Sequence, residues 1–236
     1  MSRRVAGVLR AGEAMLHQAL PGPCAFCLGT SAPGASWCGP CYRALAWNRY
    51  GCRVCGEPLR RAPALCRHCR DVAPAFSRAQ VPLVYEGAVR QLVQDFKFQA
   101  SPRAGMLLAE LFVSALGPAE AQALLPVPLH PARARQRGFN QSRWLADELG
   151  AQLGLPVLEA TRRVDTPSQR ALSRSERFAN LADAFTVASP LSGRIALVDD
   201  VMTTGATLNA LAHAARRAGA CEVVVYAVAR TSLAAT

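Results

Sequence analysis

The chain has 236 residues, 51% of them hydrophobic, which suits one main globular domain and a smaller one. No apolar run reaches the roughly 20 residues that cross a bilayer, so membrane insertion is not expected. The formal net charge is +11, and most of it falls in residues 1–78, where 11 arginines face three acidic residues. Such a basic excess favours anionic partners.

Residues 1–20 begin basic and continue apolar, as a signal peptide does, but Arg10, Glu13 and His17 interrupt the apolar stretch. The apolar residues of this segment fall on one face of a helix. We therefore expect an amphipathic helix docked on the protein, and a cytoplasmic location.

Eight of the nine cysteines form four C-x-x-C pairs, each starting 14 residues after the last: Cys24/Cys27, Cys38/Cys41, Cys52/Cys55 and Cys66/Cys69. Two such pairs supply the four thiolates of a tetrahedral zinc site, so residues 21–73 predict a module with two structural zinc ions. Disulfides are disfavoured because nothing indicates secretion, and four repeated pairs argue against a redox motif. Sequential pairing is favoured over an interleaved cross-brace, although the spacing fits both.

Residues 79–236 alternate apolar strand patterns with helical ones, which predicts an α/β domain with a parallel sheet. The boundary to the cysteine module is expected between Asp71 and Ser77. Strands are expected at 80–86, 123–129, 157–164, around Phe185, 194–198 and 222–229, and helices at 88–98, 104–116, 142–153 and 206–218.

A strand followed by two acidic residues and a threonine-rich turn marks the most informative part of the domain. Ile195–Val198 has a buried-strand pattern, and Asp199 and Asp200 follow it. Thr203–Thr207, here named the phosphate loop, leads into a helix. Its successive N–H groups can bind an anion at the helix N-terminus, and Gly205 allows a close approach. The two carboxylates can accept hydrogen bonds from vicinal hydroxyl groups. Phosphate donors beside acceptors for a diol predict that the ligand is a ribose phosphate.

All thirteen residues from Ile195 to Thr207 resemble the 5-phosphoribosyl-1-pyrophosphate (PRPP) motif of type I phosphoribosyltransferases. The resemblance extends over nearly the whole chain to the ComF family of competence proteins, which includes ComFC and GntX-like proteins. The matching pieces are the cysteine pairs, Tyr85–Gly87, Phe96–Phe98, Pro126–Leu129, Arg135–Gln141, and Gln169–Arg177 with Asn180.

The resemblance implies roles for individual residues. Asp199 and Asp200 would contact the ribose hydroxyls, and the 5-phosphate would lie on the phosphate loop. The implied PRPP-binding set is Asp199, Asp200, Val201, Met202, Thr203, Thr204, Gly205, Ala206 and Thr207, with Mg²⁺ bound alongside PRPP. Residues 125–130 occupy the place of the pyrophosphate loop, and the stretch 165–180, with Arg170, Arg174 and Arg177, corresponds to a loop that closes over the site.

Candidate catalytic or pyrophosphate-contacting residues are Lys97, Arg135, Arg137 and Arg177. Lys97 is the only lysine among 27 basic residues. Either its position needs a compact ammonium group or the lysine is retained by chance.

Three functions remain open at this point. The first is a PRPP-dependent phosphoribosyltransferase acting in natural transformation or DNA use. The second is a non-enzymatic uptake factor whose zinc module binds single-stranded DNA and works with other DNA-uptake proteins. The third is a PRPP-sensing regulator on a catalytic fold. The phosphate loop serves all three, and no acceptor pocket is readable from the sequence.

Overall fold

The structure, a computed structural model, describes residues 21–61, 65–117, 120–129, 138–162 and 184–232. The chain divides into two compact units, Met1–Leu45 and Ala46–Thr236. The helix expected over residues 1–20 lies outside the described residues. Whereas composition changes between Asp71 and Ser77, the packing division falls at Leu45, so the second half of the cysteine-rich segment shares a unit with the sheet.

The first unit has little hydrophobic core. Among its described residues, Cys24 and Leu45 are the only buried hydrophobic ones. Its one described helix, α2 (Gly39–Ala44), buries no residue. An antiparallel bridge between Pro23 and Thr30 closes the turn around the first cysteine pair. A segment of this kind needs cross-links in place of a core.

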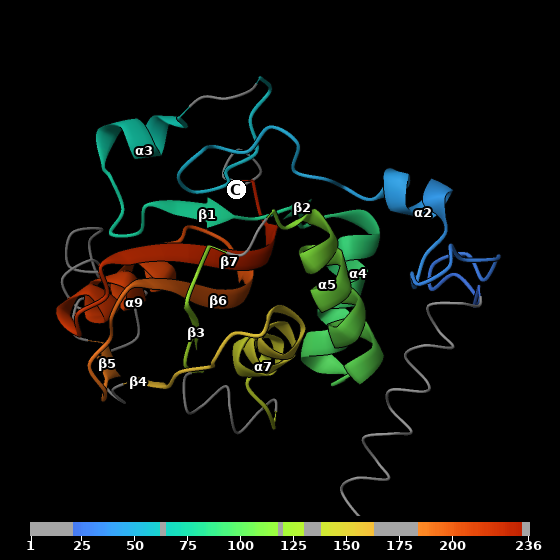
Figure 1. Cartoon of the computed structure of the whole chain (residues 1–236). Helices are drawn as coiled ribbons and strands as arrows, with labels where there is room; N and C mark the ends of the chain where they lie inside the picture. The colour runs from blue at the N-terminus through green and yellow to red at the C-terminus, as the bar shows by residue number, and fades with distance from the viewer. Residues whose placement is uncertain (1–20, 62–64, 118–119, 130–137, 163–183, 233–236) are drawn as a thin grey trace, which may run out of the picture. The chain divides into compact units, whose positions relative to one another are not determined.

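A five-stranded parallel sheet forms the centre of the second unit (Figure 1). The order is β1-β7-β6-β3, with β2 also pairing with β7. The strands are β1 (Arg78–Gln80), β2 (Leu83–Val84), β3 (Ala123–Pro126), β6 (Arg194–Met202) and β7 (Glu222–Arg230). A separate antiparallel pair joins β4 (Ala160–Arg162) to β5 (Phe185–Val187). The expected α/β class is confirmed.

Helices cover both faces of this sheet (Figure 1). On one face, Val223 and Val225 of β7 share a hydrophobic cluster with Leu211 of α9. On the other face, the Tyr226 ring lies 5.4 Å from the Phe112 ring of α5. Alternate residues of β7 therefore face opposite layers, which explains its near-continuous apolar sequence. The helices are α3 (Arg67–Asp71), α4 (Gly87–Phe98), α5 (Pro102–Ala115), α7 (Gln141–Leu153) and α9 (Ala206–Arg217).

Several strand boundaries differ from the expected ones. The strand expected over 80–86 is split into β1 and β2 at Pro82, which has no N–H group for a sheet ladder. Asn48 binds the carbonyls exposed there, donating from its side chain to Val81 and from its backbone to Pro82. β3 ends at Pro126 instead of Leu129. β6 continues past Val198 to Met202, so the acidic pair lies within the strand near its end.

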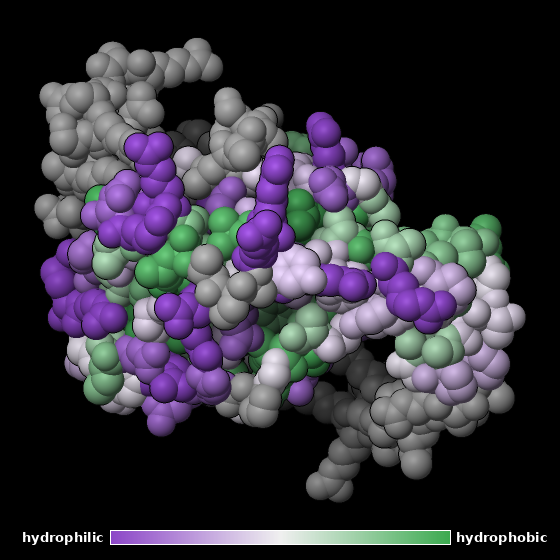
Figure 2. Space-filling view, turned by 90° about the horizontal axis from the view of Figure 1, so that it is seen from above, coloured by the Kyte–Doolittle hydropathy of each residue, from purple (hydrophilic) through white to green (hydrophobic). Residues whose placement is uncertain are grey.

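None of the described helices is both long and apolar enough to cross a membrane. In the space-filling view, hydrophobic and hydrophilic residues are interspersed on the visible face, and several hydrophilic side chains project from it (Figure 2).

Candidate functional site

A cavity of about 300 Å³ opens where β6 ends and α9 begins, within the second unit. Its lining residues come from the strand ends, from the last turn of α4, from the N-terminus of α7 and from the phosphate loop. They are Tyr85, Lys97, Val127–Leu129, Gln141, Ser142, Arg162, Asp199–Leu208 and Thr231. All nine residues expected to bind PRPP thus line one cavity, together with Lys97 and three residues of the expected pyrophosphate loop.

The phosphate loop turns sharply between β6 and α9. Gly205 has φ +78° and is the N-cap of α9. This left-handed conformation favours glycine, and a Cβ here would lie 2.6 Å from the Met202 Cε. The Thr204 hydroxyl accepts a hydrogen bond from the Ala206 N–H at 3.4 Å. The start of α9 therefore lines the cavity, where first-turn N–H groups can meet an anion.

The two acidic residues are held by the backbone and by one side chain from another element. Asp199 Oδ1 accepts hydrogen bonds from the Ser142 hydroxyl at 2.8 Å and from the Asp200 N–H at 3.0 Å. Asp200 Oδ1 accepts one from the Val201 N–H at 2.6 Å. These bonds fix the carboxylates at the cavity wall before any ligand arrives.

Lys97 forms an ion pair with this acidic pair. Its Nζ lies 3.0 Å from Asp200 Oδ2, and both side chains are largely buried, at 17% and 8% exposure. The lysine stands in the last turn of α4, far from Asp200 in sequence. The pair therefore places a cation beside the carboxylates, with its charge available to an anionic group in the same cavity.

Burial raises the pKa of Asp199 to about 7 from its ordinary value of 3.8, and the neighbouring charge of Asp200 adds to the effect. The Ser142 hydroxyl and the charge of Lys97 act in the opposite direction. Between pH 3.8 and about 7 the folded protein holds the proton more tightly than the unfolded chain. Ionisation of Asp199 therefore opposes folding increasingly as pH rises through that window.

Ser142 was not among the residues predicted from sequence. Asn140 caps α7 by accepting the Arg143 N–H, and its amide also donates to the Val127 carbonyl at 3.2 Å. These bonds join the start of α7 to the chain after β3 and bring Ser142 to Asp199. Only its place directly after the family-like stretch 135–141 could have drawn attention to it. Arg162, also missed, reaches the cavity from β4 and lies 5.6 Å from the centre of the Phe185 ring.

The remaining expected site residues lie outside the part of the chain that the structure describes. Arg135 and Arg137 lie outside the described residues, as do His130 and the expected closing loop with Arg170, Arg174 and Arg177. Lys97 is thus the one candidate catalytic residue that the described structure brings to the cavity.

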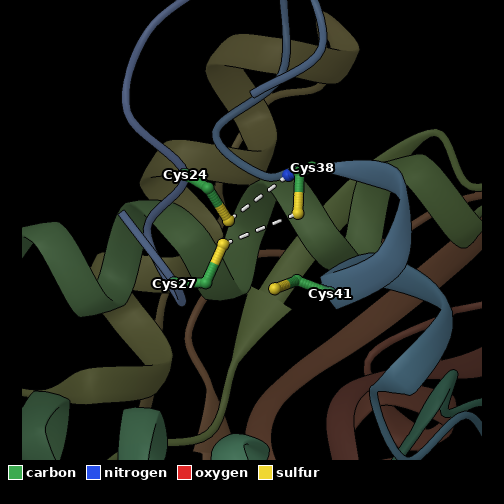
Figure 3. Close-up of side chains that lie close together, drawn as sticks. All are labelled: Cys24, Cys27, Cys38 and Cys41. Atoms are coloured by element: carbon green, nitrogen blue, oxygen red, sulfur yellow. Dashed lines mark hydrogen bonds between the residues drawn. The ribbon is translucent and has the colours of Figure 1, made fainter. Parts of the chain in front are cut away.

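The eight paired cysteines gather into two groups of four, in the sequential order favoured from the sequence. The first cysteine group is Cys24, Cys27, Cys38 and Cys41, and the second cysteine group is Cys52, Cys55, Cys66 and Cys69. Within each group the sulfur atoms lie within 4.8 Å of one another. Figure 3 shows the four side chains of the first group converging. All of these cysteines are free, so no disulfide competes with metal binding.

The two groups share one local geometry. In the first, the Cys38 N–H donates to Cys24 Sγ at 3.3 Å, and in the second the Cys66 N–H donates to Cys52 Sγ at the same distance. Cys38 and Cys66 are also the N-caps of α2 and α3. The same cysteine turn, here called the knuckle, therefore occurs twice in the chain, 28 residues apart.

The sulfur positions fit a tetrahedral metal ion. Cys27 and Cys38 Sγ lie 3.8 Å apart, and Cys55 and Cys66 Sγ lie 3.6 Å apart. A zinc ion with Zn–S bonds of about 2.3 Å requires sulfur separations of about 3.8 Å. Burial raises the pKa of Cys24, but N–H groups of Cys27 and Cys38 outweigh it and lower that pKa to about 6. Either group can hold zinc.

The fold and the site together define an α/β protein that has a loop-and-carboxylate cavity and two four-cysteine groups. Competence protein F of Haemophilus influenzae is 34% identical over 206 residues, covering 82% of this chain and 90% of that protein. DNA utilization protein YhgH of Escherichia coli (strain K12) is 32% identical over 224 residues, covering 90% and 98%. The chain therefore belongs to the ComF family of competence and DNA utilization proteins.

Comparison with family models and solved structures adds two findings. No family model matches the chain. Similar solved structures include orotate phosphoribosyltransferase from Aeropyrum pernix, with a TM-score of 0.35 and 16% identity over 56% of this chain and 75% of that one. Adenine phosphoribosyltransferase from Leishmania tarentolae has a TM-score of 0.38 and 15% identity over 64% and 76%.

The charges around Asp199 can be tested by titration. Asp200→Asn should lower the pKa of Asp199, because the Asp200 charge raises it, and Ser142→Ala should raise it further, because the hydroxyl stabilises the carboxylate. Carbon-13 NMR of labelled aspartate side chains measures both shifts. Asp147→Asn, on the exposed side of α7, is the control that should leave Asp199 unchanged. Equal values in wild type and both test variants would contradict this electrostatic account.

Proposed function

We propose that this protein binds PRPP in the cavity between β6 and α9, with phosphoribosyl transfer from PRPP as its chemistry and DNA uptake or utilisation as its cellular role. The observation that carries the proposal is the joining of two carboxylates, one ammonium group and a helix N-terminus in one cavity. The carboxylates accept hydrogen bonds from ribose hydroxyls, and the phosphate loop donates to the 5-phosphate. The cellular role is supported by the relatives, which are a competence protein and a DNA utilization protein.

Lys97 is a cation of the cavity that can contact the pyrophosphate of PRPP. Its ammonium group is held near the carboxylates by Asp200 and can also attract the negatively charged pyrophosphate. Mg²⁺ bound with PRPP would supply further positive charge for the leaving pyrophosphate. We assign Arg135, Arg137 and Arg177 to the same anionic end of PRPP as candidates, by charge and by their place in the sequence. Eight cysteines that bind zinc instead of forming disulfides would fit a reducing compartment, which supports a cytoplasmic location.

Replacement of both carboxylates should weaken PRPP binding by at least tenfold. Each lost charge-assisted hydrogen bond typically costs about 1.5–3 kcal/mol, and about 1.4 kcal/mol corresponds to a factor of ten. Asp199→Asn/Asp200→Asn and wild type should be compared by calorimetry with PRPP and Mg²⁺ at pH 8, where Asp199 is mostly ionised. Asp147→Asn/Glu148→Gln removes two negative charges from α7 outside the cavity and serves as the control.

Two results would defeat the proposal. One is the absence of PRPP binding by wild-type protein at millimolar ligand, and the other is equal affinity of the double variant. To separate an enzyme from a PRPP sensor, pyrophosphate release should be assayed with nucleobases or single-stranded DNA as acceptors. Release that depends on an acceptor identifies an enzyme, whereas binding without release identifies a sensor.

Structural zinc in both cysteine groups is the second part of the proposal. Metal analysis of the purified full chain should give about two zinc ions, and Cys38→Ser and Cys66→Ser should each retain about one. Nine titratable thiols in a metal-free protein, from the eight paired cysteines and Cys221, would refute the zinc assignment, as would four disulfides.

Binding of single-stranded DNA is a second candidate function, favoured by the exposure of every arginine between residues 43 and 70. The seven are Arg43, Arg49, Arg53, Arg60, Arg61, Arg67 and Arg70. Among the aromatic residues nearby, Tyr50 is 51% exposed, whereas the rings of Trp37 and Tyr42 stack on each other at 5.4 Å. The arginines therefore offer phosphate contacts, while part of the aromatic surface is used internally.

Affinity for a single-stranded oligonucleotide should fall steeply as salt is added, because bound phosphates release their counterions. Arg60→Gln/Arg61→Gln should weaken binding and flatten the salt dependence, and Arg90→Gln, an exposed arginine on α4, should do neither. Fluorescence anisotropy at several salt concentrations measures these effects. Binding that is indifferent to salt, or missing at low salt, would remove the nucleic-acid role.

A further inference from the structure

An arginine at the end of β7 is almost completely buried although it carries a charge. Arg230 is 1% exposed, and its guanidinium group makes contacts on several sides. Its Nη2 lies 2.9 Å from Glu57 Oε2, and Nε donates to the Cys55 carbonyl at 3.2 Å. Nη1 donates to the Met202 carbonyl at 3.0 Å. One planar group therefore holds two distant parts of the second unit.

The first of these parts is the second cysteine group. Cys55 is one of its four members, and Glu57 follows two residues later. The Glu57 carbonyl accepts the Cys52 N–H at 2.8 Å, so its backbone belongs to the same knuckle. A metal ion held by the four thiolates would fix this knuckle and with it the acceptors that Arg230 uses.

The other part is the start of the phosphate loop. Met202 ends β6 and pairs with Arg230 in the sheet register. Its side chain lies directly under Gly205, where an added Cβ would come within 2.6 Å of the Met202 Cε. Met202 is also followed directly by Thr203, the first residue of the phosphate loop, so its backbone position sets where the turn into α9 begins. The Ala75 N–H also donates to the Asn209 side chain of α9 at 2.7 Å, a second link to the segment that follows the cysteines.

The chemistry of arginine explains the choice of side chain. A guanidinium group offers five donors in a rigid plane and can bind a carboxylate and several carbonyls at once. A buried charge is tolerated only when it is paired and hydrogen-bonded, and Arg230 meets both conditions.

The first cysteine group, unlike the second, belongs to the other compact unit.

We propose that Arg230 is a positioning residue that couples the second cysteine group to the phosphate loop, so that zinc at Cys52, Cys55, Cys66 and Cys69 raises the affinity for PRPP. This inference rests on the PRPP binding proposed above. Zinc at the first cysteine group has no part in the coupling. The metal thus acts on ligand binding as well as on folding.

A matched pair of variants tests the coupling in the full chain. Cys38→Ser and Cys66→Ser change equivalent ligands of the two groups, each an N-cap of its helix. Calorimetry should show PRPP affinity at least about fivefold weaker for Cys66→Ser, the low end of ordinary coupling energies, and unchanged for Cys38→Ser. Equal affinities of the two variants would overturn the inference.

Arg230→Lys tests the route, since it keeps a positive charge opposite Glu57 but loses the planar fork. It should retain two zinc ions yet bind PRPP more weakly. Adding Cys66→Ser to it should cause little further loss, because the two changes break one connection. Additive losses would show that Arg230 is not the connection.

Thermodynamic reciprocity supplies a measurement with Arg230 intact. Cys38→Ser keeps only the second group, and its zinc affinity can be measured by competition with a chromophoric chelator. PRPP with Mg²⁺ should raise this zinc affinity by the same factor by which zinc raises the PRPP affinity. In Cys66→Ser, which keeps only the first group, PRPP should change nothing. A PRPP-independent zinc affinity in Cys38→Ser, in a protein that binds PRPP, refutes the coupling alone. Failure of wild type to bind PRPP refutes the proposed function itself.

Discussion

The pairing of β6 with β7 is the constraint on which the described site depends. Both strands are buried on both faces, and their register places Met202 opposite Arg230. Parallel neighbours need a crossover, which α9 supplies here, and only Thr203, Thr204 and Gly205 lie between the end of β6 and its start. So short a turn requires the left-handed conformation of Gly205, and it directs the first turn of α9 toward the cavity.

Charge in the cavity is balanced locally, although the chain as a whole is strongly basic. Burial disfavours ionised carboxylates in the strand, and the repulsion between the two adds to the cost, in line with the raised pKa of Asp199. Lys97 and Ser142, from two different helices, reduce that cost. The site therefore holds acceptors for hydroxyl groups while keeping a cation within reach of an anion.

The two cysteine groups show that one local geometry can serve different surroundings. The first stands in a unit whose described residues have almost no hydrophobic core, so a metal there would replace a core. The second is continuous with the hydrophobic cluster on the α9 side of the sheet, which also contains Met202. A metal there would act within an existing core, beside the phosphate loop.

The sequence by itself determined the local features. The C-x-x-C pairs predicted two four-cysteine sites without fixing their pairing order, apolar runs predicted a parallel α/β sheet, and the residues from Ile195 to Thr207 predicted where the loop lies. Each of these features leaves a short pattern of residue types in the sequence, which is why it could be predicted. Strand ends were less predictable at two places. At Pro82 a proline interrupts the ladder, and in β6 strand pairing continues through the two acidic residues to Met202.

Only the tertiary structure decided which distant residues meet. Lys97 pairs with Asp200, Ser142 with Asp199, and Arg230 with Glu57, each across a separation that no local pattern records. The packing division at Leu45 was also hidden, because the composition is alike on both sides of it while the core is not. Contacts of this kind depend on sheet order and helix packing, whose free energy belongs to the whole unit and cannot be assigned to a short segment of sequence.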